Sequence, residues 1–166
     1  HAKLGYTWRE CPWTPRLGAE FAYASGDRDP NDGDNNTFDN LYTCPTSYYG
    51  RMNLFAWRNL MDYMVTFSVK PMKKLRLWVD YHYFTLASDR DAWYWFNHNP
   101  QARDATGGSG HELGHEIDLL ADRRTPIEEF AAFESRVTPG QEVGQDQVFQ
   151  MGAVGLCAFG QMQRDA

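Results

Sequence analysis

Residues 62–84 read DYMVTFSVKPMKKLRLWVDYHYF, and apolar and polar side chains alternate along two runs within them. The apolar positions are Tyr63, Val65, Phe67 and Val69 in the first run and Leu75, Leu77, Val79, Tyr81 and Tyr83 in the second. Successive side chains of a β-strand point to opposite faces, so a period of two is typical of a strand with one apolar and one polar face. The pattern predicts two strands, 62–70 and 74–84, joined by a short turn.

Alternation of the same kind predicts further strands on both sides of this pair. They cover 3–9, 16–24, 115–122, 127–137 and 148–159, which brings the total to about seven. The connections between them alternate in length: 10–15, 71–74 and 124–126 are short, whereas 25–57, 87–114 and 138–147 are long.

In an antiparallel meander, this alternation places all short connections at one end of the sheet and all long ones at the other. The last strand would then run toward the short-turn end. Transmembrane β-barrels have this arrangement, with short periplasmic turns and long extracellular loops. The sequence therefore predicts an all-β fold, an antiparallel meander of the kind that forms part of a larger transmembrane β-barrel.

Composition narrows the classes of function. The chain has 166 residues, with 16 Lys and Arg against 22 Asp and Glu, for a formal net charge of -6. This acidic balance argues against nucleic acid as a partner, because phosphate contact needs a basic face. Aromatic residues make up 15% of the chain. Carbohydrate-binding surfaces and membrane-interface belts both show such enrichment.

Several short segments carry a resemblance to a known family. They are Arg16–Gly33, Thr37–Tyr42, Asn53–Asn59, Lys70-Pro71, Lys73–Leu75, Asp80–His82, Asp91–Tyr94 and Gly114–Leu119. In their order and spacing, over residues 16–119, the chain resembles the alginate export family of bacterial outer-membrane β-barrels. The resemblance thins after Leu119 and is least specific over 127–166.

The resemblance implies an outer-membrane export channel of roughly eighteen strands that passes an anionic polysaccharide like alginate, or similar solutes, and catalyses no reaction. Such a barrel needs several hundred residues, so we expect this chain to be a C-terminal piece. Residues 1–166 would form one partial barrel domain, with 25–57 and 87–114 as extracellular loops that restrict the mouth. The implied partners are outer-membrane lipid, the polysaccharide and periplasmic secretion proteins, and no cofactor is implied.

The polar faces of the strands supply candidates for the lining of the channel. They are Arg16, Glu20, Arg58, Asp62, Arg76, Asp80, His82 and Asp118. An anion-selective pore needs a ring of Arg or Lys at its constriction, and this set mixes both signs. Arg16, Arg76 and His82, with Arg58 near a loop base, are the best candidates to guide a polyanion, and the alginate specificity rests on the resemblance.

An acidic loop contains Asp27, Asp29, Asp32 and Asp34. Gly33 comes one place too late for an EF-hand that starts at Asp27. Two interpretations stay open for this loop. The four aspartates bind Ca²⁺ loosely, or they serve as ordinary turn residues, which the composition favours.

Residues 111–115 read HELGH and match the H-E-x-x-H zinc-protease motif. The motif requires a helix, whereas Gly114 inside it and the alternation that follows favour a loop that runs into a strand. Two alternatives to a channel therefore remain. One is a soluble β-sandwich that binds carbohydrate through Trp93, Tyr94 and Trp95. The other, with less support, is a zinc metalloprotease that uses His111, Glu112 and His115.

Overall fold

The computed structural model of the chain describes residues 1–29, 31–41, 49–123 and 158–159. The strands within these ranges are β1 (Ala2–Thr7), β2 (Arg16–Ala24), β3 (Leu60–Met72), β4 (Leu75–Thr85), β5 (Trp93–Tyr94), β6 (Pro100–Ala102), β7 (Glu112–Arg123) and β8 (Ala158–Phe159). Six of them form one antiparallel sheet in the order β1-β2-β3-β4-β7-β8, and β5 pairs with β6 separately. The predicted all-β, antiparallel fold class is confirmed. The described residues include no helix of the length and apolarity needed to cross a membrane.

The predicted strands differ from the observed ones mainly at their ends. β3 is longer than the predicted 62–70, and β7 begins at Glu112 rather than at residue 115. The predicted strand 127–137 lies outside the described residues, as does 148–159 apart from its last two.

The direction predicted for the last strand was wrong. Ala158 and Phe159 pair antiparallel with His115 and Gly114 of β7. Because β8 is a direct antiparallel neighbour of β7, it runs toward the end that carries the long connections.

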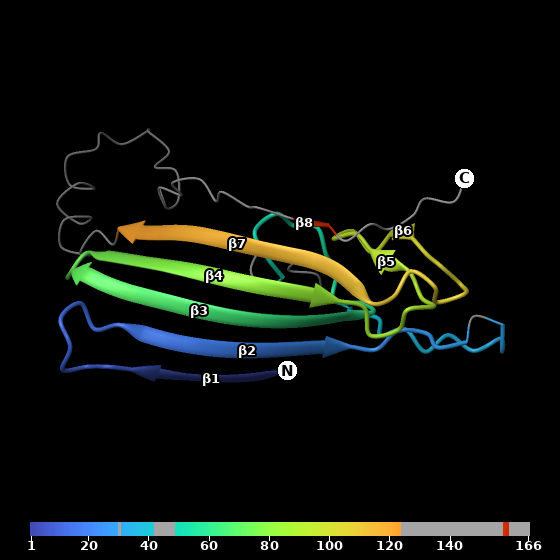
Figure 1. Cartoon of the computed structure of the whole chain (residues 1–166), viewed down its shortest axis with the longest axis horizontal. Coiled ribbons are helices and arrows are strands. Elements are labelled where there is room, and N and C mark those ends of the chain that lie inside the picture. The colour runs from blue at the N-terminus through green and yellow to red at the C-terminus, as the bar shows by residue number, and fades with distance from the viewer. Residues whose placement is uncertain (30, 42–48, 124–157, 160–166) are drawn as a thin grey trace, which may run out of the picture.

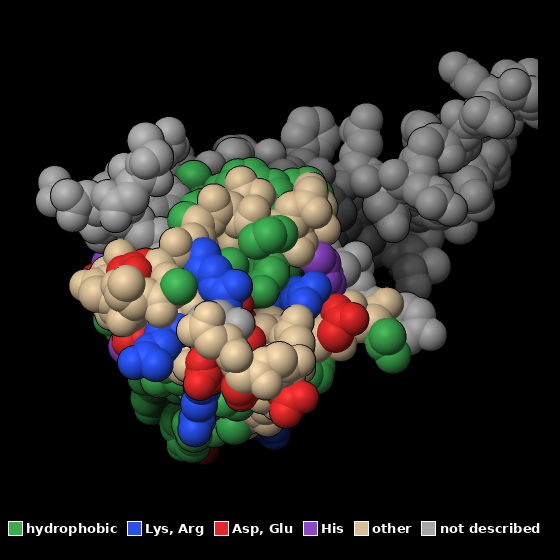
Figure 2. Space-filling view, turned by 90° about the vertical axis from the view of Figure 1, so that its right-hand side faces the viewer, with side chains coloured by type: hydrophobic (Ala, Val, Ile, Leu, Met, Phe, Trp, Pro, Cys, Tyr) green, Lys and Arg blue, Asp and Glu red, His purple; other side chains and the backbone are tan. Residues whose placement is uncertain are grey.

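The two ends of the sheet carry connections of different length, as predicted (Figure 1). The long connections, 25–59 and 86–111, lie at the end where β2 and β4 finish and β7 begins. The short turns between β1 and β2 and between β3 and β4 lie at the other end. Acidic and basic side chains are interspersed over the end with the long connections (Figure 2).

The two faces of the sheet have opposite burial. On the apolar face, Val65, Phe67 and Leu119 are 45%, 44% and 52% exposed. On the polar face, His82 and Glu116 are 3% and 0% exposed. A soluble protein buries its apolar side chains and leaves charged ones in water, so this sheet has the reverse arrangement.

The compact core lies at the long-connection end. It consists of Phe55, Leu60, Phe84, Leu86 and Leu113, with Tyr49, Leu54 and Trp93 packed against it. The Phe55 ring lies 4.2 Å from that of Phe84. Phe84 lies two residues after His82 and therefore on the same, polar face of β4. The connection between β2 and β3 therefore folds back over the polar face.

Asn59 joins the two long connections. Its side-chain amide donates to the carbonyls of Ser88 and Ala92 at 3.0 Å each and accepts the Ser88 N–H at 2.7 Å. Its backbone has φ = +46°, a conformation that asparagine tolerates better than most residues. Gly26 packs so closely on this side chain that a Cβ would lie 1.9 Å from the Asn59 Oδ1.

Candidate functional site

The polar face brings together most of the residues predicted to line a channel. Seven of the eight candidates, Arg16, Glu20, Asp62, Arg76, Asp80, His82 and Asp118, stand on β2, β3, β4 and β7. Cross-strand pairing places His82 opposite Met64 and Glu116, and Asp80 opposite Thr66 and Asp118. The two-residue period thus grouped these residues on one continuous polar face of the sheet, here called the polar wall.

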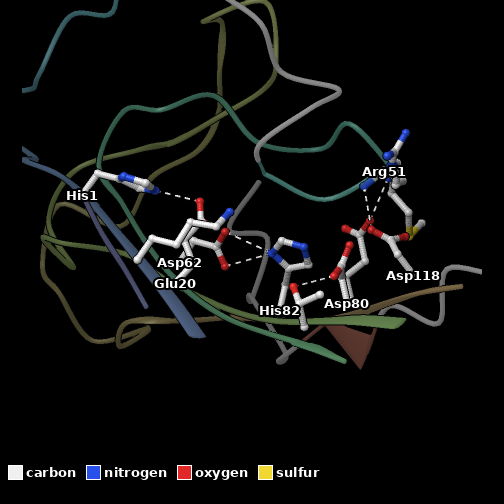
Figure 3. Close-up of polar contacts among 11 residues, drawn as sticks. His1, Glu20, Arg51, Asp62, Asp80, His82 and Asp118 are labelled. Atoms are coloured by element: carbon white, nitrogen blue, oxygen red, sulfur yellow. Dashed lines mark hydrogen bonds and ion pairs between the residues drawn. The ribbon is translucent and has the colours of Figure 1, made fainter. Parts of the chain in front are cut away.

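Asp62 and His82 form a buried pair on this wall (Figure 3). The His82 Nδ1 lies 3.1 and 3.0 Å from the two Asp62 carboxylate oxygens. Both side chains are 4% exposed. A buried charge is tolerated where a partner and hydrogen bonds compensate it, so each residue holds the other in place.

Glu20 is the centre of a second group of charges. Its carboxylate pairs with Lys3 and lies 2.7 Å from the His1 Nε2 (Figure 3). Nearby on the same face, Arg16 donates to the Thr7 hydroxyl at 3.0 Å. The negative charge of Glu20 is therefore largely offset by its neighbours.

Asp80 is held by two neutral donors. The Thr66 hydroxyl donates to it at 2.6 Å, and the Trp78 indole N–H donates at 3.1 Å. The Arg76 guanidinium lies 5.0 Å from the centre of the Trp78 ring, within the range of a cation–π contact. Trp78 thus links an acidic and a basic candidate.

A segment of the long connection between β2 and β3 lies against this wall. The backbone N–H of Arg51 donates to Asp118 at 3.1 Å, and that of Met52 donates to Glu116 at 2.8 Å. The sequence predicted 25–57 as an extracellular loop at the mouth, whereas residues 50–52 reach Asp118, near the middle of β7. The alternation in the sequence could place Glu116 on the polar face beside Asp118. It could not predict the contact with residues 50–52, because backbone donors from a loop produce no periodic pattern.

A cavity of about 340 Å³ lies between the wall and this segment. The charged residues that line it include Lys3, Arg51 and Arg76 of one sign and Glu20, Asp80 and Asp118 of the other. The three acids already accept hydrogen bonds or ion pairs from neighbouring groups.

Arg58 is the one predicted lining residue that the structure places away from the wall. Its guanidinium lies 3.4 Å from the Asp39 carboxylate and 4.7 Å from the centre of the Tyr94 ring. Burial and the hydrogen bond to Asp91 raise the pKa of Tyr94, so its hydroxyl stays a donor at neutral pH. Arg58 belongs to the packed base of the long connections, as its predicted position near a loop base implied.

The acidic loop uses its carboxylates in tight turns. Asp27 accepts the N–H of Asp29, Asp29 that of Asn31 and Asp32 that of Asp34. No group of three or more His, Cys, Asp or Glu side chains in the described part of the chain is placed to hold a metal ion. The contacts agree with the turn interpretation of Asp27, Asp29, Asp32 and Asp34, and loose calcium binding there stays a prediction.

The HELGH motif lies on a strand. Glu112 to His115 belong to β7, and His115 stacks on Tyr83 at 4.7 Å on the apolar face. His111 lies elsewhere, with its Nδ1 3.1 Å from the Leu86 carbonyl oxygen. The helix on which a zinc protease would place both histidines is absent from this stretch, so the motif is a coincidence of sequence.

The aromatic residues predicted for carbohydrate binding pack the long connections instead. Trp93 packs against the core and donates its indole N–H to the Leu54 carbonyl at 3.3 Å. The Tyr94 hydroxyl donates to Asp91 at 2.9 Å. Trp95 lies beside Trp93, with 5.9 Å between the ring centres. These contacts give Trp93 and Tyr94 a structural role.

An antiparallel sheet with one exposed apolar face and one polar face has the side-chain pattern of the strands of a transmembrane β-barrel. The sequence model of the family described as alginate export matches residues 1–152. The chain therefore belongs to the alginate export family. The match extends well beyond the 16–119 of the predicted resemblance and covers part of 127–166. No curated protein and no solved structure gave a match.

Proposed function

We propose that this chain forms part of the wall of an outer-membrane channel that exports an alginate-type anionic polysaccharide. The observation that carries the proposal is the reversed burial of the sheet, in which large apolar side chains face outward in rows while Asp62, His82, Glu116 and Asp118 are covered. A contiguous apolar surface of this kind marks contact with a membrane or another protein.

The apolar face has the features of a lipid-facing surface. Leucine, valine and phenylalanine side chains occupy its middle, where Phe67, Leu77 and Leu119 line a shallow apolar groove. Aromatic pairs lie toward both ends: Tyr6 with Trp8 at the short-turn end, and Tyr63 with Tyr83 toward the other. Aromatic bands at two heights are typical of the two interfaces of a bilayer.

The polar face supplies the path for the solute. Arg16 and Arg76 are the arginines that β2 and β4 place on the wall, and Glu20 and Asp80 on the same face are paired or hydrogen-bonded. A polyanion that moves along such a wall meets the basic groups while most of the negative charge is compensated. Periplasmic secretion partners stay a prediction from the resemblance.

The test is ion current through the full-length channel that carries this chain, reconstituted in a planar lipid bilayer. An oligomer of uronic acids should lower the current, whereas a neutral oligosaccharide of equal length should not. Arg76→Glu should weaken the block and shift the selectivity toward cations. Arg123→Glu, at the far end of β7 on the other face, is the matched control and should leave both unchanged. Equal effects of the two oligosaccharides would overturn the proposed solute class.

A further inference from the structure

Residues 49–53, here called the inturned segment, lie on the polar wall through two backbone hydrogen bonds. Arg51 and Met52 donate their N–H groups to Asp118 and Glu116 (Figure 3). These bonds span 67 and 64 residues of sequence. The position of the segment on the wall is therefore fixed by contacts with a distant part of the chain and not by the geometry of a local turn.

The two acids depend on this segment. Glu116 and Asp118 are 0% and 1% exposed. Apart from a contact between the two carboxyl groups, Glu116 Oε2 and Asp118 Oδ1 accept no hydrogen bond from a described residue. Burial of a carboxylate is costly unless donors compensate it. The N–H groups of the segment are thus the main donors that make these buried positions tolerable.

Gly50 makes the close approach feasible. Its φ of +76° is in the left-handed region, and a Cβ at this position would lie 2.2 Å from the Glu116 Oε2. Any larger residue would force the Glu116 carboxylate aside and with it the acceptor for Met52. Gly110 has the same φ of +76°, but a Cβ there would have nothing within 4 Å, which makes Gly110 a matched comparison.

The side chain of Arg51 projects away from the acids that its backbone contacts. In Figure 3 its guanidinium points away from Asp118. It lines the same cavity as Lys3 and Arg76, and none of the described carboxylates forms an ion pair with it. The segment thus covers two acids of the wall and adds a basic side chain to the lining of the cavity.

We propose that Glu116 and Asp118 are positioning residues, which hold the inturned segment on the wall so that Arg51 faces the anionic solute. This inference deepens the proposed function and rests on it. It has an unexpected consequence: two buried acids favour the passage of anions, because they act through the arginine that they place.

Hydrogen exchange tests the docking independently of transport. In the full-length protein in detergent or lipid, the amides of Arg51 and Met52 should be protected. Gly50→Ala should accelerate their exchange by roughly tenfold or more, as expected from the loss of a hydrogen bond to a charged acceptor. Gly110→Ala should leave it unchanged. The double variant Glu116→Gln with Asp118→Asn keeps an acceptor oxygen at each site and should retain most of the protection.

Ion selectivity in planar bilayers tests the role of the docking. Gly50→Ala changes no charge, yet it should reduce the preference for anions and raise the conductance, because Arg51 leaves its place and the acids become exposed. Arg51→Gln should reduce the anion preference without a rise in conductance. Gly110→Ala should match the unmodified channel in both selectivity and conductance.

The outcomes separate the two claims. Unprotected Arg51 and Met52 amides in the unmodified protein, or Gly50→Ala channels with unchanged selectivity, would overturn the positioning role. Protected amides together with a channel that does not distinguish anionic from neutral oligosaccharides would leave the docking intact and overturn the proposed function.

Discussion

Met52, in the connection between β2 and β3, donates its backbone N–H to the Glu116 carboxylate of β7 at 2.8 Å. The bond joins a loop to the polar wall near the middle of a strand. It supplies a hydrogen-bond donor to a carboxylate that is 0% exposed. The long connection therefore contributes to the interior of the structure as well as to its end.

Val79→Arg should destabilise the protein in a bilayer by about 2–4 kcal/mol, the cost of an arginine on the lipid face near mid-depth. Leu75→Arg is the matched control, since it lies on the same face at the start of the same strand and should cost about 0–1 kcal/mol. Urea unfolding of the full-length protein in lipid vesicles measures both. A cost for Val79→Arg no larger than that for Leu75→Arg would contradict the assignment of this face to lipid.

Asn59→Ala should loosen both long connections, because it removes two buried donors and one acceptor. We expect a cost of roughly 2–4 kcal/mol for three such bonds. Limited proteolysis within 25–59 and 86–111 reports the loss. Gly26→Ala should give the same cleavage pattern, since its Cβ would displace the Asn59 side chain. Resistance of both variants to cleavage would show that the two connections are held by other contacts.

Asp62→Ala should cost about 1–3 kcal/mol, because it leaves His82 buried without its partner. The double change Asp62→Leu with His82→Phe removes both polar groups and should be milder than the single one. A double-mutant comparison by chemical denaturation checks this. If the double change is as costly as the sum of the single ones, the two residues are not coupled.

The turn around Asp104 should withstand acid. Hydrogen bonds from Thr106 and Ser109 lower the pKa of Asp104 below its ordinary value of 3.8. A carboxylate with a lowered pKa contributes its full stabilisation above the unfolded value and loses it only as the pH falls through the folded value. Exchange of the Ser109 amide, measured from about pH 7 to about pH 4, should therefore show constant protection after correction for intrinsic rates. Loss of protection already at about pH 5, or protection that survives in Asp104→Ala, would contradict this.

The fold could be predicted from the sequence because a two-residue period fixes both the strand and its faces. The runs 62–70 and 74–84 show this most clearly, since every odd position in them is apolar and the structure places those side chains on one face. The ends of the strands were less predictable. Gly114 lies beside a register shift between Phe84 and Thr85. It interrupts the alternation of side chains, so the sequence did not indicate that β7 begins at Glu112.

The wall residues followed from the same period, but their partners did not. Asp62 and His82 were both predicted on the polar face, and their direct contact depends on the register between β3 and β4, which alternation alone leaves open. Arg51 and Gly50 were missed because their importance comes from a contact over more than sixty residues of sequence. The HELGH motif shows the opposite case: its spacing matches a zinc-protease motif, whereas the structure has a strand from Glu112 onward, as the alternation after the motif favoured.

The central claim is that one face of this sheet meets lipid and the other meets water. Nitroxide labels at Met64, Val65, Thr66 and Phe67, introduced one at a time into the full-length protein in lipid vesicles, test it most directly. Val65 and Phe67 should be reached by molecular oxygen, which concentrates in lipid, while Met64 and Thr66 should be reached by a water-soluble nickel chelate. Equal access of the nickel chelate to all four positions would contradict the account.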